Sequence, residues 1–96
     1  MYKLIFKKRA IEEIRDSYIY YELKQKGLGE KFEKTVNTYL DTLEINPTQF
    51  RISYKIFREI VIQEFPFIII YYVLKIKKEV VIMSFFDTSK NPIKKY

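Results

Sequence analysis

Arg58 is the residue of this chain whose sequence surroundings most favour chemistry. It falls in the stretch Ile56–Ile62, where it alternates in register with isoleucines, a pattern that predicts a strand. A guanidinium on an apolar strand face is costly unless it pairs with a carboxylate or binds an anion. Two interpretations follow. Arg58 is either a clamp for a phosphate or a transition state, which suits its planar fork, or half of a structural ion pair with Glu64 or Asp87.

A second polar group, Asp87–Pro92, directly follows the last apolar stretch, and loops at strand ends often carry functional residues. Asp87 is suited to hold a cation, Ser89 to hydrogen-bond a phosphate, and Lys90 to supply positive charge. We take Arg58 and Lys90 as the candidate catalytic residues, and Asp87 and Ser89 as candidates for target binding. An ordinary polar exit loop is the alternative interpretation.

Basic residues near aromatic rings mark two further candidate contacts with a target. Arg51 and Lys55 precede the second predicted strand, and Lys94 and Tyr96 lie at the end of the sequence. Lysine is suited to contact phosphate and tyrosine to stack on a base, as in single-stranded RNA recognition. The alternative for Lys94 and Tyr96 is a frayed chain end.

The composition excludes several reaction classes. The chain contains no histidine and no cysteine, so a Ser-His-Asp or Cys-His mechanism and a thiolate zinc site are impossible. It has no Gly-rich phosphate loop and no carboxylate cluster with metal-ligand spacing. We therefore expect no metal and no cofactor, and any enzymatic activity would be metal-independent.

The net charge of +6 is unevenly placed along the chain. Residues 1–46 hold 9 basic and 8 acidic residues, and residues 47–96 hold 9 basic and 4 acidic residues. A basic half suits a polyanion or an acidic protein as partner. We therefore predict that four basic residues lie together on one side of the sheet or its rim, away from the helices. These residues are Arg51, Lys55, Arg58 and Lys90.

Periodicity predicts an α+β fold with the order β-α-α-β-β-β over a single domain, residues 1–96. The predicted elements are strand Tyr2–Lys7, helix Lys8–Lys26, helix Glu30–Ile45, and strands Ile56–Glu64, Phe67–Ile76 and Val80–Phe86. The helices should form an antiparallel hairpin on one face of a mainly antiparallel four-stranded sheet, with the first strand beside the last or the central one. Thr48–Tyr54 is expected to be a loop or a short irregular strand.

Several local features refine this picture. Gly27 is expected at the C′ position of the first helix in the left-handed conformation, and Glu12 and Glu13 in its first turn. Nine tyrosines and eight phenylalanines exceed what a small core needs. Some aromatic rings should therefore stay partly exposed and available to a partner. We expect these to be among Tyr18, Tyr20, Tyr21, Phe50 and Phe57. No signal peptide or membrane span is evident, so a cytoplasmic protein is expected.

Taken together, these segments resemble toxins of the RelE/ParE superfamily of type II toxin–antitoxin systems. The resemblance runs from the opening strand through Leu43–Pro47 and Arg58 to Phe65–Tyr72 and the closing Thr88–Pro92. It implies a growth-inhibiting, plasmid-stabilising toxin that a cognate antitoxin wraps and neutralises. The sequence resembles ParE-like members more than RelE-like ones. This resemblance implies that the protein poisons DNA gyrase and cleaves nothing itself.

The resemblance leaves alternatives open. RelE-like members cleave messenger RNA in the ribosome, and here Arg58 would steady the phosphorane while Lys90 assists attack by the 2′-hydroxyl. A non-enzymatic nucleic-acid-binding domain or an inactivated toxin is the third interpretation. ParE-like relatives usually have histidine at the position of Asp87 and arginine at that of Lys90. From this we predict that Asp87 pairs with Arg58.

Overall fold

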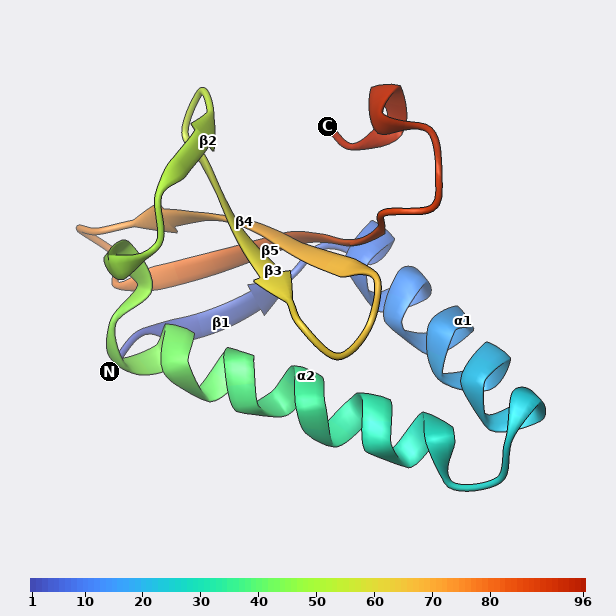
Figure 1. Cartoon of the computed structure of the whole chain (residues 1–96). Coiled ribbons are helices and arrows are strands. Elements are labelled where there is room, and N and C mark those ends of the chain that lie inside the picture. Colours follow the sequence, from blue (N-terminus) through green and yellow to red (C-terminus); the bar gives the residue numbers. More distant parts are fainter.

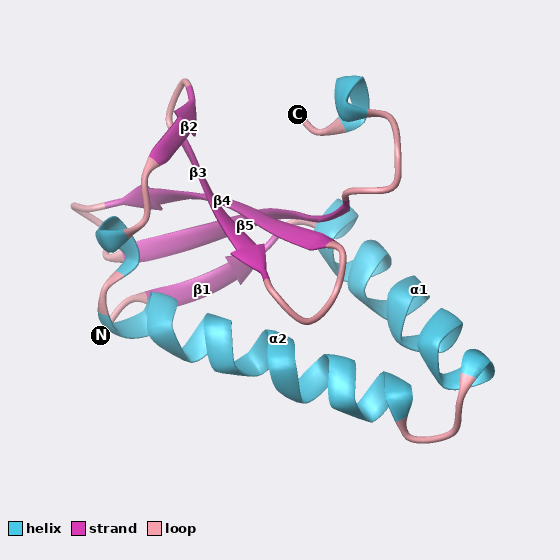
Figure 2. Cartoon of the chain, viewed as in Figure 1, coloured by secondary structure: helices cyan, strands magenta, loops and turns pink.

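The computed structural model describes all of residues 1–96. Figure 1 shows the path of the chain, and Figure 2 shows its helices and strands. In chain order the elements are β1 (Lys3–Phe6), α1 (Lys8–Lys24), α2 (Leu28–Ile45), the 3-10 turn η1 (Pro47–Gln49), β2 (Ile52–Tyr54), β3 (Phe57–Ile62), β4 (Phe67–Leu74), β5 (Glu79–Asp87) and the 3-10 turn η2 (Pro92–Lys94).

The strands form one mixed sheet in the order β1-β5-β4-β3-β2. β1 runs parallel to β5, and the other neighbours are antiparallel. Both helices pack against one face of this sheet (Figure 1). The predicted fold class is confirmed, with β1 beside the last strand. The sheet has five strands rather than four because the irregular segment before Lys55 pairs with β3 as the short edge strand β2.

The core lies between the helices and the inner face of the sheet. The stripe of α2 is as predicted, with Phe32, Val36, Leu40 and Leu43 buried. Each such side chain contributes about 1.5–3 kcal/mol when it is fully removed from water. The strand residues that face this stripe are buried too, and the chief ones are Ile60, Ile62, Phe67, Ile69, Tyr71, Val80, Ile82 and Phe85. By alternation Phe57, Glu59 and Val61 lie on the outer face of the sheet, away from the helices.

The turn between the helices depends on both glycines. Gly27 has φ +88°, so its left-handed conformation is as predicted, although it caps the start of α2 rather than the end of α1. The Glu22 carboxylate accepts hydrogen bonds from the backbone N–H groups of Gly27 (2.9 Å) and Gly29 (3.0 Å). A Cβ on Gly29 would lie 2.7 Å from the carbonyl oxygen of Tyr18, so Gly29 lets α2 approach α1 closely. α2 begins at Leu28, two residues before the predicted start.

The structure corrects two predictions about α1. The helix ends at Lys24 rather than Lys26. Glu12 and Glu13 both lie beyond its first turn, so the helix dipole does not explain either carboxylate. Glu13 turns instead toward β5, as described below. None of the helices is both long and apolar enough to cross a membrane.

Candidate functional site

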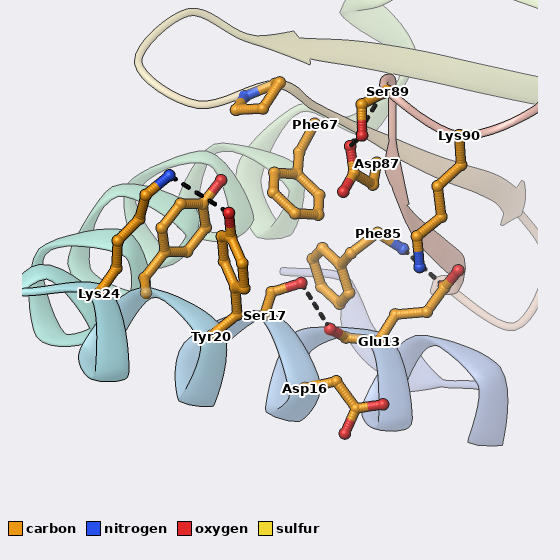
Figure 3. A pocket seen from close by; sticks show the side chains of 12 residues that line it. Glu13, Asp16, Ser17, Tyr20, Lys24, Phe67, Phe85, Asp87, Ser89 and Lys90 are labelled. Carbon is orange, nitrogen blue, oxygen red and sulfur yellow. Dashed lines mark hydrogen bonds between the residues drawn. The ribbon is translucent and has the colours of Figure 1, made fainter.

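A cleft lies between α1 and the end of β5 (Figure 3). Its volume is about 740 Å³, and aromatic rings, hydroxyls and charges of both signs line it. The wall from α1 includes Tyr20, Tyr21 and Lys24. The opposite wall brings together three predicted site residues, Asp87, Ser89 and Lys90. The remaining lining residues are Glu13, Asp16, Ser17, Pro66, Phe67 and Phe85.

Glu13 closes the inner end of this cleft. β1 stops at Phe6, which is paired with Ile82, so the rest of β5 has no strand beside it on that edge. The Glu13 carboxylate takes the place of the missing strand. Its Oε1 accepts hydrogen bonds from Ser84 Oγ at 2.7 Å and from the Phe85 backbone N–H at 3.1 Å. Its Oε2 lies 3.3 Å from Arg9 Nε. Glu13 thereby holds α1 at a set distance from β5.

Asp87 organises the opposite wall of the cleft. Its Oδ1 accepts hydrogen bonds from the Ser89 backbone N–H at 2.9 Å and from Ser89 Oγ at 2.7 Å, and its carbonyl oxygen accepts one from the Lys90 N–H at 3.0 Å. These bonds curl the exit loop so that Lys90 faces the cleft. Burial, and then the negative charge of Asp87, raise the pKa of the Tyr21 hydroxyl. Tyr21 therefore stays protonated as a hydrogen-bond donor at neutral pH.

The predicted pair of Arg58 and Asp87 is wrong. Arg58 is opposite Tyr71 on β4, whereas Asp87 is opposite Phe67. Four residues of strand, about 13 Å, separate these positions. Arg58 Nη1 instead donates to the carbonyl oxygens of Thr48 (3.2 Å) and Phe50 (2.5 Å). The guanidinium thus satisfies its need for polar partners with the backbone around η1, and it holds that loop against β3.

Tyr71 completes this anchor for η1. Its side chain is fully buried, and its hydroxyl donates a 2.6 Å hydrogen bond to the carbonyl oxygen of Pro47. Burial raises the pKa of the Tyr71 hydroxyl to about 12, with the nearby Arg58 charge acting in the opposite direction. The two residues tie the same loop to neighbouring strands, so both stabilise its position.

Alkaline pH should loosen this anchor. The pKa of Tyr71 is higher in the folded chain than in the unfolded chain, so its stabilising contribution is complete below pH 10. It should be lost as the pH rises from about 10 to 12, lowering the free energy of unfolding by up to about 2.7 kcal/mol. Urea titrations followed by circular dichroism at several pH values would measure this. Tyr71→Phe should lack most of the decline, the rest coming from Tyr21, whose pKa is also raised, and Tyr54→Phe, at an exposed tyrosine, should retain it. The same decline in Tyr71→Phe would contradict the assignment.

The outer face of the sheet carries a second polar cluster. Lys95 Nζ lies 2.9 Å from Glu59 Oε2, and the Tyr96 hydroxyl donates a hydrogen bond to the same carboxylate. Burial acts to raise the pKa of Glu59, but the hydrogen bonds from Tyr96 and Lys95 outweigh it, so the pKa lies below its usual range. The Tyr96 ring lies against Tyr54 and Phe57. The chain end is therefore folded onto the sheet and is not frayed.

The predicted site residues fall in separate places. Lys90 is in the cleft, Arg58 is under η1, and Arg51 and Lys55 are exposed beside β2. The prediction of one basic surface is therefore wrong, because Lys90 faces α1 from the far end of the sheet. Lys94 contributes its carbonyl oxygen, which accepts a 2.6 Å hydrogen bond from Arg9. The five aromatic residues predicted to be partly exposed are confirmed to be so.

Sequence reasoning missed Glu13 and Glu59 as organising residues. For Glu13 the signal was its helical spacing from Ala10, Ser17 and Tyr21, which places a carboxylate on the buried side of α1. For Glu59 the signal was its alternation with Phe57 on the outer face of β3. Neither signal identifies the partner, because Ser84 and Lys95 are distant in the sequence.

Comparison with known proteins adds a family and a fold. Residues 4–92 match the family model described as the ParE toxin of the type II toxin–antitoxin system parDE. No curated protein matches the sequence. Three solved structures with similar folds come from toxin–antitoxin systems. A chain of the chromosomal ParDE system from P. aeruginosa is 18% identical, with a TM-score of 0.62 and coverage of 88% of this chain and 92% of that chain.

The other two structures come from E. coli. The isolated RelE toxin is 17% identical, with a TM-score of 0.70 and coverage of 99% of this chain and 93% of that one. A chain of the intact RelBE toxin–antitoxin complex is 21% identical, with a TM-score of 0.53 and coverage of 88% and 93%. At these identities the likeness establishes the arrangement of helices and strands, and the family follows from the match over residues 4–92.

Proposed function

The chain belongs to the ParE toxin family of type II toxin–antitoxin systems, within the RelE/ParE superfamily, and we propose that it inhibits growth by binding DNA gyrase. In this proposal the toxin performs no chemistry of its own. The cleft between α1 and the end of β5 is its contact surface for gyrase.

One observation carries this proposal. The two candidate catalytic residues of the sequence analysis, Arg58 and Lys90, do not converge. Arg58 is held by the backbone carbonyls of Thr48 and Phe50, and Lys90 lies beyond Asp87 at the other end of the sheet. A general acid or base must lie within hydrogen-bond reach of the reacting group that its partner holds. This separation favours binding over cleavage by those two residues.

The cleft has the composition of a protein-binding surface. Tyr20 is 57% exposed, and its hydroxyl accepts a 3.2 Å hydrogen bond from Lys24 Nζ, which holds both side chains in place. Tyrosines with few accessible rotamers are frequent hot spots in interfaces. Lys90 and Asp87 on the opposite wall supply both signs of charge at the rim, where charge sets specificity. A folded protein target fits this mixture better than a uniformly anionic strand.

Toxins of this superfamily pair with antitoxins, and we propose a separate surface for the cognate antitoxin. A groove of about 470 Å³ runs between the two helices. Its apolar lining includes Phe6, Ile11, Ile14 and Tyr18, of which Phe6 and Ile11 are 38% and 49% exposed. An amphipathic helix laid in this groove would cover these side chains.

The gyrase proposal predicts the effect of changes in the cleft. The double variant Tyr20→Ala/Lys90→Ala should keep its fold and lose at least about tenfold in the potency with which it traps gyrase–DNA cleavage complexes, since one hot-spot side chain is worth 2 kcal/mol or more. The measurement is a plasmid cleavage assay with purified gyrase. Lys77→Ala, at the exposed turn between β4 and β5, is the matched control. Full potency of the double variant would remove the cleft from the mechanism.

A second candidate function, a ribosome-dependent messenger RNA endoribonuclease, is favoured by the cluster on the outer face. Glu59, Lys95 and Tyr96 place a carboxylate, an ammonium and a phenol in contact, and such groups can move protons. In this case induced expression should cause cleavage of messenger RNA and leave gyrase unaffected. The Glu59→Gln variant should no longer cause this cleavage. Ribosome profiling beside the gyrase assay separates the two functions.

A further inference from the structure

The turn between β4 and β5 presents a bare isoleucine among lysines. Ile76 is 100% exposed. The lysines around it, Lys75, Lys77 and Lys78, are exposed as well. Lys3 is also exposed and lies beside this turn, because its N–H donates a 2.9 Å hydrogen bond to the carbonyl oxygen of Lys78. The turn projects from the end of the sheet (Figure 1). We call these five residues the basic tip.

The four lysines of the basic tip have no acidic partner. None of them forms an ion pair with a carboxylate. Even Glu79, which follows Lys78 and is opposite Lys3 in the register of β1 and β5, lies more than 4.0 Å from either ammonium. Like charges that crowd a short turn without counter-charges create a local positive potential. An anionic surface would neutralise this potential.

The geometry of the turn does not account for the lysine at its last position. Lys78 has φ +55°, in the left-handed region that favours glycine or asparagine. Its N–H closes the turn with a 3.2 Å hydrogen bond to the carbonyl oxygen of Lys75, a bond that any residue except proline could make. The Lys78 ammonium lies over the Tyr2 ring, 5.5 Å from its centroid. A glycine would form the same turn with less strain, so the fold does not need this charge.

A second aliphatic side chain is bare at the same end of the molecule. Ile45, the last residue of α2, is 73% exposed. The carbonyl oxygen of Glu44 accepts a 2.8 Å hydrogen bond from the Tyr2 N–H, which joins the end of α2 to the start of β1. The end of α2 and the β4–β5 turn both lie on the left of Figure 1. Exposed apolar groups beside charges mark interaction surfaces.

The pairing of bare isoleucines with lysines distinguishes between anionic partners. The phosphate backbone of a nucleic acid would satisfy the lysines but would leave Ile76 in water. The Tyr2 ring is not free for base stacking on the face that the Lys78 ammonium covers. The surface of an anionic bilayer offers both phosphate headgroups for the lysines and, just below them, an apolar layer for an aliphatic side chain. A lipid surface therefore fits the basic tip better than a nucleic acid does.

We propose that the basic tip binds the surface of an anionic lipid membrane, with the lysines on the headgroup phosphates and Ile76 inserted between the headgroups. The contact is peripheral and reversible, because one turn buries little apolar surface. The tip adjoins the Glu79 end of β5, whereas the cleft assigned to gyrase adjoins the Asp87 end, about 26 Å away along the strand. The two surfaces are separate, so either proposal can fail without the other.

The test is co-sedimentation of the full-length protein with vesicles. The protein should bind phosphatidylcholine vesicles that contain about 30% phosphatidylglycerol and should not bind vesicles of phosphatidylcholine alone. Lys75→Ala/Lys77→Ala should weaken the partition coefficient about 25-fold, since each lysine near an anionic surface contributes a factor of about five. Ile76→Ser should weaken it about tenfold, because the inserted aliphatic side chain is lost.

Two further variants separate binding from folding. Lys78→Gly relieves the positive φ, so it should melt at the same or a higher temperature and still bind vesicles about fivefold more weakly. Ile93→Ser is the matched control for Ile76→Ser, because Ile93 is 87% exposed and also precedes lysines, and it should bind as the unaltered protein does. All these variants should keep full potency in the plasmid cleavage assay with gyrase.

Three results would overturn the proposal. The first is an unaltered protein that does not sediment with the anionic vesicles. The second is vesicle binding that Ile76→Ser leaves unchanged, because nothing would then be inserted. The third is binding to a duplex DNA oligonucleotide in place of vesicles, weakened by Lys75→Ala/Lys77→Ala and insensitive to Ile76→Ser, since the partner of the basic tip would then be a nucleic acid.

Discussion

Replacing Arg58 by alanine should destabilise the protein by about 2–3 kcal/mol, because the carbonyl oxygens of Thr48 and Phe50 lose a charged donor in a partly buried setting. Toxicity should fall only as far as the folded fraction falls. This result would differ from that of an active-site clamp, whose removal leaves the fold intact and abolishes toxicity. Urea denaturation of the purified variant, beside growth curves of cells that express it, measures both quantities.

Two companion variants sharpen the test of Arg58. Arg51→Ala removes an exposed arginine nearby and should change stability by less than about 0.5 kcal/mol. Arg58→Lys keeps the charge but loses the fork that reaches two carbonyls, so it should lie between the alanine variant and the unaltered protein. A fully stable Arg58→Ala protein that no longer inhibits growth would show that Arg58 contacts the target.

Replacing Glu13 by alanine should cost about 2–4 kcal/mol, the other large effect that we expect. The change removes the acceptor for the fully buried Ser84 hydroxyl and for the Phe85 backbone N–H. It also leaves Arg9 without its carboxylate, and it opens the free edge of β5 to water. Since Glu13 lies in the cleft wall, α1 should lose its set position relative to β5, and the binding to gyrase that we propose should weaken as well.

A double-mutant cycle isolates the contact between Glu13 and Ser84. Glu13→Gln keeps one acceptor oxygen and should cost about half as much as Glu13→Ala. In a Ser84→Ala background, Glu13→Ala should cost at least about 1 kcal/mol less than it does alone, because the two side chains share one hydrogen bond. Additive costs, measured by urea denaturation, would mean that the contact contributes little to stability.

Much of the fold was predictable from local patterns. The apolar run from Phe67 predicted a buried central strand. The four-residue spacing of Phe32, Val36 and Leu40 predicted the buried face of α2. β2 was less predictable, because it has only three residues, all exposed, and pairs irregularly with β3. The start of α2 was misplaced because glycine usually signals a turn. At Gly29 its missing side chain instead serves close helix packing.

The candidate site was only partly predictable. Asp87, Ser89 and Lys90 are neighbours in the sequence and emerge from one strand end, so their convergence in one cleft followed from local position. The other wall of that cleft, Tyr20 and Lys24, comes from a helix distant in the chain. Its placement depends on how α1 docks on β5, which no local pattern specifies.

By itself, the sequence determined the kinds of element, the absence of histidine and cysteine chemistry, and the motifs that mark the family. Only the tertiary structure decided which charged groups meet. The alternation of β3 shows that Arg58 shares a face with isoleucines, but the pairing register places Asp87 about 13 Å farther along the sheet and the η1 carbonyls beside Arg58 instead. Register and docking depend on contacts summed over distant segments, whereas periodicity reports only the local environment of each residue.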